Sequence, residues 1–219
     1  MLFFIDTANL DQIQEAAELG ILDGVTTNPS LMAKEGISGE RNIAAHYRRI
    51  CELVGEGDVS AEVIATDYKG IVEEGRRLAE IHENIVVKAP MTRDGVKAIA
   101  ALTELDIRTN CTLVFSTAQA ILAAKAGATY VSPFIGRIDD INWDGMSLIS
   151  EISDVYINAG FTTYILAASI RNSRHIVEAA KAGADVVTCP LNAILGMFQH
   201  PLTGIGLEKF LADHRKLNG

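Results

Sequence analysis

Short apolar runs alternate with longer amphipathic stretches along the whole chain. The runs are rich in β-branched residues and bounded by glycine or polar residues, which is typical of short strands buried on both faces. They predict eight strands, over Leu2–Asp6, Gly24–Asn28, Asp58–Ile64, Asn84–Ala89, Arg108–Val114, Ala128–Phe134, Thr163–Ala168 and Ala184–Cys189.

The longer stretches repeat their apolar residues with the period of an α-helix. Several end at a glycine, such as Gly127 and Gly183, that can close a helix in the left-handed conformation. Helices are expected near Leu10–Leu19, Asn42–Val54, Asp67–Ile81, Arg93–Leu105, Thr117–Ala126, Gly145–Ala159, Asn172–Ala182 and Ile194–His200. A further helix is expected over residues 206–217.

Buried strands separated by helices predict a parallel sheet that is covered by helices. Eight such units in 219 residues, with no linker or low-complexity segment, predict one (β/α)8 TIM barrel over residues 1–219. The alternative, a doubly wound sheet, favours a glycine-rich phosphate loop after the first strand. Here the first strand leads into Asp6-Thr7-Ala8-Asn9, which contains no glycine, so the barrel is favoured.

Composition narrows the class of protein. The net charge of -9 argues against nucleic acid or an anionic membrane as a partner, and no segment is long and apolar enough to span a membrane. Cys51, Cys111 and Cys189 are widely spaced, so we expect reduced core thiols in a cytoplasmic protein. The five histidines are also scattered, and no metal site is predicted.

Polar side chains lie at or near the end of most predicted strands. In a barrel the carboxyl ends of all strands meet at one mouth, where active sites form. Any one of these residues could simply cap a helix, but a ring of acids, amides, hydroxyls and a lysine is typical of a catalytic pocket. The ring consists of Asp6, Thr26, Asn28, Glu62, Lys88, Asn110, Thr112, Ser132 and Ser169.

Lys88 is the most informative member of this ring. It lies near the end of an apolar run that begins at Ile85 and stops at Pro90. A lysine at a strand end often reaches to the surface, but burial favours the neutral amine, which attacks carbonyl groups and forms Schiff bases. The polar residues on the neighbouring strands favour the catalytic interpretation.

Schiff-base chemistry needs groups that move protons and water. Glu62 and Thr112, on the two neighbouring strands, are placed to hold the water that leaves the carbonyl carbon. Asp6 is the candidate base for carbon–carbon bond cleavage. Asp6 could instead cap the helix that begins near Leu10, but Asn9 can serve that role.

Two arginines follow neighbouring strands of the predicted barrel. Arg137 comes after the sixth strand and Arg171 after the seventh, both on the side of the mouth. Each could be an ordinary surface residue. Because the guanidinium group binds phosphate with two parallel hydrogen bonds, the pair in an acidic protein favours an anion site.

Six motifs together resemble those of the transaldolase family, over a span from Phe3 to beyond Pro190. The length of the chain is similar to that of the short, transaldolase-like or fructose-6-phosphate aldolase-like members. The motifs are Asp6-Thr7-Ala8-Asn9, Val25-Thr26-Thr27-Asn28-Pro29-Ser30, Val87-Lys88, Asn110-Cys111-Thr112, Ser132-Pro133-Phe134-Ile135-Gly136-Arg137 and Ala168-Ser169-Ile170-Arg171-Asn172.

The resemblance implies a role for each residue of the ring. Lys88 would form the Schiff base, Asp6 would be the acid and base at the C4 hydroxyl of the substrate, and Glu62 and Thr112 would position the catalytic water. The hydroxyls of a sugar-phosphate substrate would be bound by Thr26, Asn28, Asn110 and Ser132. Its phosphate would be bound by Arg137, Ser169 and Arg171. No cofactor is implied, because the lysine itself is the electron sink.

The family contains two activities, and two positions are associated with the difference. Aldolases of the family resemble one another in having Tyr at the position of Phe134 and Gln at that of Glu62, so this chain is similar to the transaldolases. The implied reaction converts sedoheptulose 7-phosphate and glyceraldehyde 3-phosphate to erythrose 4-phosphate and fructose 6-phosphate, in the pentose phosphate pathway. The alternatives are a fructose-6-phosphate aldolase, a metal-assisted barrel enzyme, and a non-catalytic sugar-phosphate-binding barrel.

The expected C-terminal helix, over residues 206–217, is amphipathic. Its apolar residues, Leu207, Phe210, Leu211 and Leu217, lie among charged ones. The helix could pack on its own barrel. Short members of the family, however, tend to form pentamers or decamers in which this helix reaches a neighbour, and by resemblance we expect such a homo-oligomer.

Overall fold

Eight parallel strands close into a barrel in chain order in the computed structural model, which describes residues 1–218. β1 pairs with β2 on one side and with β8 on the other, so the sheet has no free edge. The strands are β1 (Leu2–Asp6), β2 (Gly24–Thr26), β3 (Asp58–Glu62), β4 (Ile85–Pro90), β5 (Thr109–Val114), β6 (Tyr130–Pro133), β7 (Tyr164–Ala167) and β8 (Val186–Cys189). The predicted barrel is confirmed.

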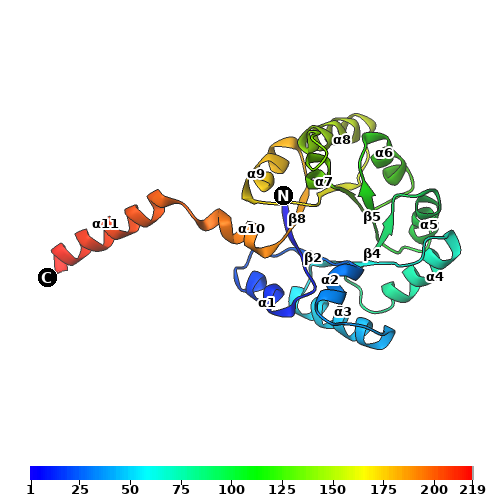
Figure 1. Ribbon diagram of the computed structural model, residues 1–219, viewed down its shortest axis with the longest axis horizontal. Coiled ribbons are helices and arrows are strands. Elements are labelled where there is room, and N and C mark those ends of the chain that lie inside the picture. Colours follow the sequence, from blue (N-terminus) through cyan, green and yellow to red (C-terminus); the bar gives the residue numbers. More distant parts are fainter. Residues whose placement is uncertain (219) are drawn as a thin grey trace.

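Helices surround the barrel on its outside (Figure 1). They are α1 (Leu10–Glu18), α2 (Pro29–Lys34), α3 (Glu40–Val54), α4 (Tyr68–Ala79), α5 (Arg93–Thr103), α6 (Thr117–Lys125), α7 (Ile135–Asp139), α8 (Gly145–Ala159), α9 (Ser173–Ala182) and α10 (Leu191–Leu195). A 3-10 turn over Gly196–Phe198 follows α10, and α11 (Pro201–Asn218) ends the chain.

The alternation of side chains along each strand creates two separate apolar regions. On β4, Val87 points outward into the large core between sheet and helices, and Val86 points into the barrel. The barrel interior is filled by a second, smaller cluster. It consists of Phe4, Val86, Tyr130, Leu166, Ala168 and Val186, with Phe134 packed against it.

Inside the barrel, the inward positions change from apolar to polar toward the carboxyl ends of the strands. On β4 the apolar Val86 is followed at the next inward position by Lys88, and on β8 Val186 is followed by Thr188. These polar side chains are buried, so they need hydrogen-bond partners within the barrel. The buried polar residues of this layer are Thr26, Ser60, Lys88, Asn110, Thr112, Ser132 and Thr188.

Two short helices were not predicted. α2 begins directly after Asn28, whose side chain caps it, with Pro29 in its first turn. The predicted second strand, Gly24–Asn28, wrongly extends over this cap, because its β-branched residues continue to Thr27, next to Asn28. α7 spans only five residues, which is too short to display a helical period.

The C-terminal segment also differs from the prediction. The helix expected near Ile194–His200 is α10 plus a 3-10 turn, and the last helix begins at Pro201 instead of residue 206. Gly204 and Gly206 lie inside α11, and glycine disfavours a helix interior, which explains the late predicted start. α11 extends away from the barrel (Figure 1), so it does not pack on its own barrel.

The three cysteines are free and buried, as predicted. Burial raises the pKa of each thiol, Cys51, Cys111 and Cys189, to about 12, so all three are protonated at neutral pH. They act as small apolar core residues. Over residues 1–218, no helix combines the length and the apolar character that a membrane crossing requires.

Gly24 lies in a tightly packed part of the barrel, next to Phe4 of the apolar cluster. A Cβ at this position would lie 2.5 Å from Cε1 of Phe4 and 2.6 Å from the carbonyl oxygen of Asp58. We expect Gly24→Ala to lower the free energy of unfolding by about 1–3 kcal/mol, through overpacking. Urea denaturation measures this. The control is Gly204→Ala, where nothing lies within 4 Å of the added carbon; equal losses in both variants would contradict the packing argument.

Candidate active site

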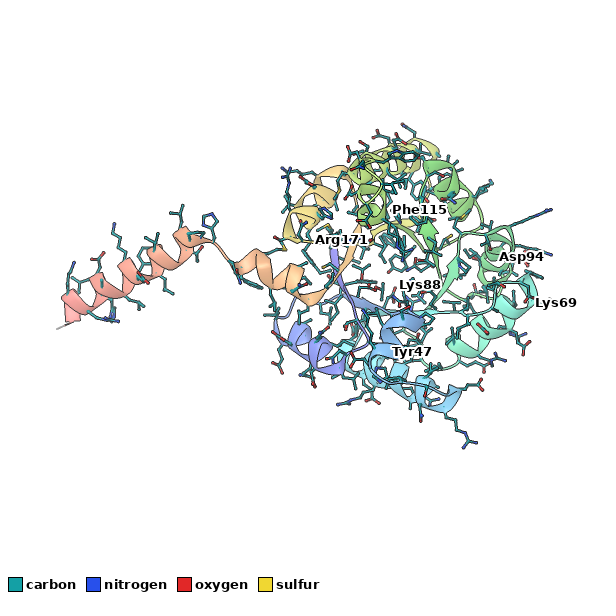
Figure 2. The ribbon with its side chains drawn as sticks, viewed as in Figure 1. Tyr47, Lys69, Lys88, Asp94, Phe115 and Arg171 are labelled. Carbon is teal, nitrogen blue, oxygen red and sulfur yellow. The ribbon has the colours of Figure 1, made fainter. Side chains whose placement is uncertain are left out.

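Lys88 lies in the interior of the barrel (Figure 2) and is 5% exposed. Its Nζ is 3.1 Å from Oε2 of Glu62 and donates a hydrogen bond to the backbone carbonyl of Thr27, also at 3.1 Å. Glu62 and Lys88 are register partners on β3 and β4, so the ladder of the sheet places them side by side. The structure therefore brings together two of the predicted catalytic residues.

Asp6 is the end of a short chain of hydroxyl groups. Thr26 Oγ1 donates to Asp6 Oδ1 at 2.7 Å and lies 2.6 Å from Thr188 Oγ1. An ionised carboxylate only accepts hydrogen bonds, so Thr26 donates to Asp6 and Thr188 donates to Thr26. The chain fixes the carboxylate at the mouth. Asn9 caps α1, as expected, which leaves Asp6 for this role.

Asn110 is held from both sides inside the barrel. Its Nδ2 donates to Ser60 Oγ at 3.1 Å, and Ser132 Oγ donates to its Oδ1 at 2.7 Å. Asn110 is also the register partner of Lys88 on β5. An amide next to the amine is therefore fixed in one orientation, with β3, β5 and β6 each contributing one group.

Thr112 lies nearer the mouth than Asn110 on the same strand, and it is fully buried. Its hydroxyl has no hydrogen-bond partner among residues 1–218. The pairing of β5 and β6 is irregular between Cys111 and Val114, and Leu113 has a φ of 62°. Such a bulge re-aims side chains at the end of a strand, and bulges are common next to active sites.

Asn28 caps a helix, and this limits which of its side-chain atoms can bind a ligand. Its Oδ1 accepts a hydrogen bond from the backbone N–H of Leu31 and caps α2. The amide nitrogen is then the group that remains for a ligand hydroxyl. Asn28 is half-buried next to Thr27, whose carbonyl contacts Lys88.

Phe134 forms an aromatic wall at the carboxyl end of β6. Its ring packs against the apolar cluster of the barrel interior and makes an edge-to-face contact with Phe115, with centroids 5.8 Å apart. The guanidinium carbon of Arg137 lies 4.9 Å from the centroid of the Phe134 ring. This contact orients an exposed arginine along the wall.

The second predicted arginine lies near the start of α7. Arg171 pairs with Asp140 at 2.6 Å, and a Cβ on Gly136 would lie 2.6 Å from Arg171 Nε and 2.2 Å from the Ser169 carbonyl. Only glycine fits at that contact. Ser169 has a φ of 60°, a conformation that non-glycine residues rarely adopt and that is often found at functional sites. Phe115 and Arg171 are both labelled in Figure 2.

A cavity of about 600 Å³ reaches Glu62 from the side of the barrel. It opens between α2, the segment that follows it, α3 and α4, and its walls are mainly apolar. Tyr47 of α3 also lines it. Glu62 is therefore the point where the polar interior of the barrel meets an opening between helices.

Four further residues support the site and were not predicted from the sequence. Ser60 and Thr188 occupy inward positions one layer below the mouth; strand alternation counted back from Glu62 on β3 finds Ser60, and alternation along β8 finds Thr188. Thr27 contributes only a backbone carbonyl to Lys88, and Tyr47 comes from a helix. No sequence pattern signals either of those two contacts. Over residues 1–218, no three His, Cys, Asp or Glu side chains are grouped to hold a metal ion.

A family model described as Transaldolase/Fructose-6-phosphate aldolase matches residues 3–218 of the chain. The chain belongs to this family. Membership confirms the resemblance seen in the six motifs and makes the protein an enzyme of the transaldolase and aldolase type.

Curated relatives agree with this family, and a solved structure is similar in fold. A probable transaldolase of Cytophaga hutchinsonii is 66% identical and one of Parabacteroides distasonis is 64% identical, each over 100% of both chains. A solved thiamine phosphate pyrophosphorylase from Pyrococcus furiosus is similar with a TM-score of 0.60, at 17% identity, over 85% of this chain and 83% of that one. At that identity the likeness shows the barrel fold alone.

Proposed function

We propose that this protein is a Schiff-base transaldolase that transfers a dihydroxyacetone unit between sugar phosphates. The observation that carries the proposal is the buried amine of Lys88, held 3.1 Å from the Glu62 carboxylate inside a polar barrel mouth. The substrates would be sedoheptulose 7-phosphate and glyceraldehyde 3-phosphate, and the products erythrose 4-phosphate and fructose 6-phosphate. This places the enzyme in the pentose phosphate pathway, in the cytoplasm.

The first half of the reaction forms a covalent bond between enzyme and ketose. The neutral Lys88 amine attacks the carbonyl carbon, and the carbinolamine then loses its hydroxyl as water to give an iminium ion. Glu62 lies within hydrogen-bonding distance of Nζ and is placed to carry the protons of this step. The Thr112 hydroxyl, which is buried without a protein partner in the described residues, would bind the departing water.

The second half breaks and remakes a carbon–carbon bond. Asp6 takes the proton of the C4 hydroxyl, the C3–C4 bond breaks, and its electrons flow to the iminium nitrogen. An aldose phosphate leaves, and an enamine remains on Lys88. The enamine attacks the aldehyde of the acceptor, Asp6 returns the proton, and water releases the new ketose. The hydroxyl chain from Thr188 through Thr26 supports a fixed orientation of Asp6.

The remaining ring residues would bind the substrate. Thr26, Asn28, Asn110 and Ser132 supply hydroxyl and amide groups beside Lys88 for the sugar hydroxyls. Arg137, Ser169 and Arg171 would bind the phosphate. Arg171 is paired with Asp140, at about half exposure of both side chains, so the phosphate would compete with a solvent-screened ion pair.

Phe134 is the residue on which the choice between the two family activities is proposed to depend. Its ring carries no hydroxyl, and its neighbours at the wall are the Phe115 ring and the Arg137 guanidinium. The enamine would therefore have no phenolic proton donor at this wall and would persist until an acceptor aldehyde arrives. A fructose-6-phosphate aldolase would instead protonate the enamine and release free dihydroxyacetone.

We further propose a homo-oligomer, a pentamer or decamer, in which α11 binds a second copy of the chain. The helix extends away from its own barrel (Figure 1). It exposes a set of large apolar side chains that cost free energy in water. These are Leu202, Ile205, Leu207, Phe210, Leu211 and Leu217.

Lys88→Ala tests the nucleophile. We expect kcat to fall by roughly 10³-fold or more, because among residues 1–218 no other lysine forms an ion pair with Glu62. Borohydride reduction in the presence of fructose 6-phosphate should leave a covalent adduct, the reduced Schiff base of the ketose or of its dihydroxyacetone part, on the wild-type protein and on Lys69→Ala, a surface control, but not on Lys88→Ala. Folded Lys88→Ala with near-normal turnover would overturn the mechanism.

Phe134→Tyr tests the choice of activity. Wild-type protein should release glyceraldehyde 3-phosphate from fructose 6-phosphate only when erythrose 4-phosphate is present. The variant should gain acceptor-independent release, by roughly tenfold or more, because a phenol can protonate the enamine. Phe115→Tyr, on the neighbouring ring, is the control. Acceptor-independent release by the wild-type protein would identify a fructose-6-phosphate aldolase instead.

Removal of α11 tests the assembly. A chain shortened to end at Thr203 should have a lower molar mass in light scattering than the full chain, because most of the exposed apolar helix face is gone. Phe210→Asp in the full chain should have the same effect, by placing a charge in the contact. An unchanged oligomer in both variants would remove α11 from the interface.

A further inference from the structure

Tyr47 is a buried hydroxyl that the proposed mechanism does not use. It lies on α3, is 3% exposed, and its Oη is 3.0 Å from Thr27 Oγ1. Burial is the main cause that raises its pKa, so the hydroxyl stays protonated and is available as a donor. In Figure 2, Tyr47 lies at the outer helices, and Lys88 lies further toward the centre of the barrel.

The direction of the hydrogen bonds around Thr27 can be assigned. Thr27 Oγ1 donates to the backbone carbonyl of Ser60 at 3.3 Å, so it accepts the proton of the Tyr47 hydroxyl. Tyr47 and Glu62 also line the same cavity. Through the Thr27 hydroxyl, the phenol is linked both to the chain just after β2 and to the Ser60 carbonyl of β3.

Thr27 and Glu62 both contact the Lys88 amine. The carbonyl of Thr27 accepts a hydrogen bond from Lys88 Nζ, and the carboxylate of Glu62 lies at the same distance of 3.1 Å. β2 ends at Thr26, so Thr27 lies one residue beyond the strand. Because the strand pairing of β2 no longer holds Thr27, the hydrogen bond from Tyr47 of α3 supports it there.

We propose that Tyr47 is a positioning residue for Lys88, whose hydroxyl holds Thr27 so that the Thr27 carbonyl stays against the amine. The inference rests on the proposed function and adds to it a residue on an outer helix. Tyr47 does not contact the substrate. It fixes the direction from which Nζ meets the carbonyl carbon, and small displacements of reacting groups lower rates strongly.

Tyr47→Phe removes the hydroxyl and keeps the buried ring. We expect the rate of Schiff-base formation and kcat to fall about 5- to 20-fold, with KM for fructose 6-phosphate changed less than about twofold, because the proposed substrate-binding groups lie on other residues. Schiff-base formation is measured by rapid quenching into borohydride and mass spectrometry of Lys88.

Tyr156→Phe is the matched control. Tyr156 is 4% exposed, and its hydroxyl donates to the carbonyl of Ala120 at 2.7 Å, between α8 and α6. Both substitutions remove one buried hydroxyl and its hydrogen bond, so both should lower thermal stability by a similar amount. Tyr156→Phe should keep kcat within about twofold of wild type.

A second variant covers the case in which Tyr47→Phe does not fold. Thr27→Val keeps the shape of the side chain and the backbone carbonyl but removes the hydroxyl that accepts from Tyr47. It should slow Schiff-base formation in the same way, and the double variant should be no slower than the slower single one. Additive losses would contradict a shared contact.

The outcomes separate the inference from the proposed function. If wild-type protein forms no reducible adduct at Lys88, the proposed function fails, and the role of Tyr47 falls with it. If wild type forms the adduct and Tyr47→Phe forms it equally fast, only the inference fails. Losses of kcat in Tyr47→Phe and Tyr156→Phe that simply follow their melting temperatures would also overturn it.

Discussion

The burial of the Lys88 amine inside the barrel is the constraint on which the rest of the site depends. A charged or strongly polar group in such a place is costly unless it is paired and hydrogen-bonded. The Glu62 carboxylate and the Thr27 carbonyl meet this requirement, each at 3.1 Å from Nζ. The same pairing that satisfies the buried amine places a carboxylate beside it, the group that we propose carries its protons, so stability and the proposed chemistry use one contact.

The apolar residues that stabilise the barrel and the polar residues of the site lie at opposite ends of the barrel interior. At one end of its interior, Phe4, Val86 and Leu166 form a dry apolar plug that contributes to stability. At the other, polar layers from seven strands share their hydrogen bonds, so that few orientations of any one side chain are left. A rigid polar layer on a dry plug keeps reactive groups in position before the substrate binds.

Much of the fold was readable because its signals are local. Strand length, β-branched residues and terminal glycines predicted eight strands and the barrel, and the polar strand ends predicted the ring around Lys88. The failures were local as well: α7 is too short to show a period, and Gly204 and Gly206 hid the start of α11. The resemblance to the family, which the family match confirmed, supplied the roles that residue types alone left open.

The sequence by itself determined the barrel and which side chains stand at its mouth, because the alternation of a strand and the direction of parallel strands follow from short-range geometry. Only the tertiary structure decided which groups contact Lys88 and Thr27. Thr27 contacts Lys88 through a backbone carbonyl, which no side-chain pattern encodes. Tyr47, which contacts Thr27, lies on a helix and is 20 residues from Thr27 in the chain. Such contacts depend on how layers pack, and packing is set by the closed barrel as a whole.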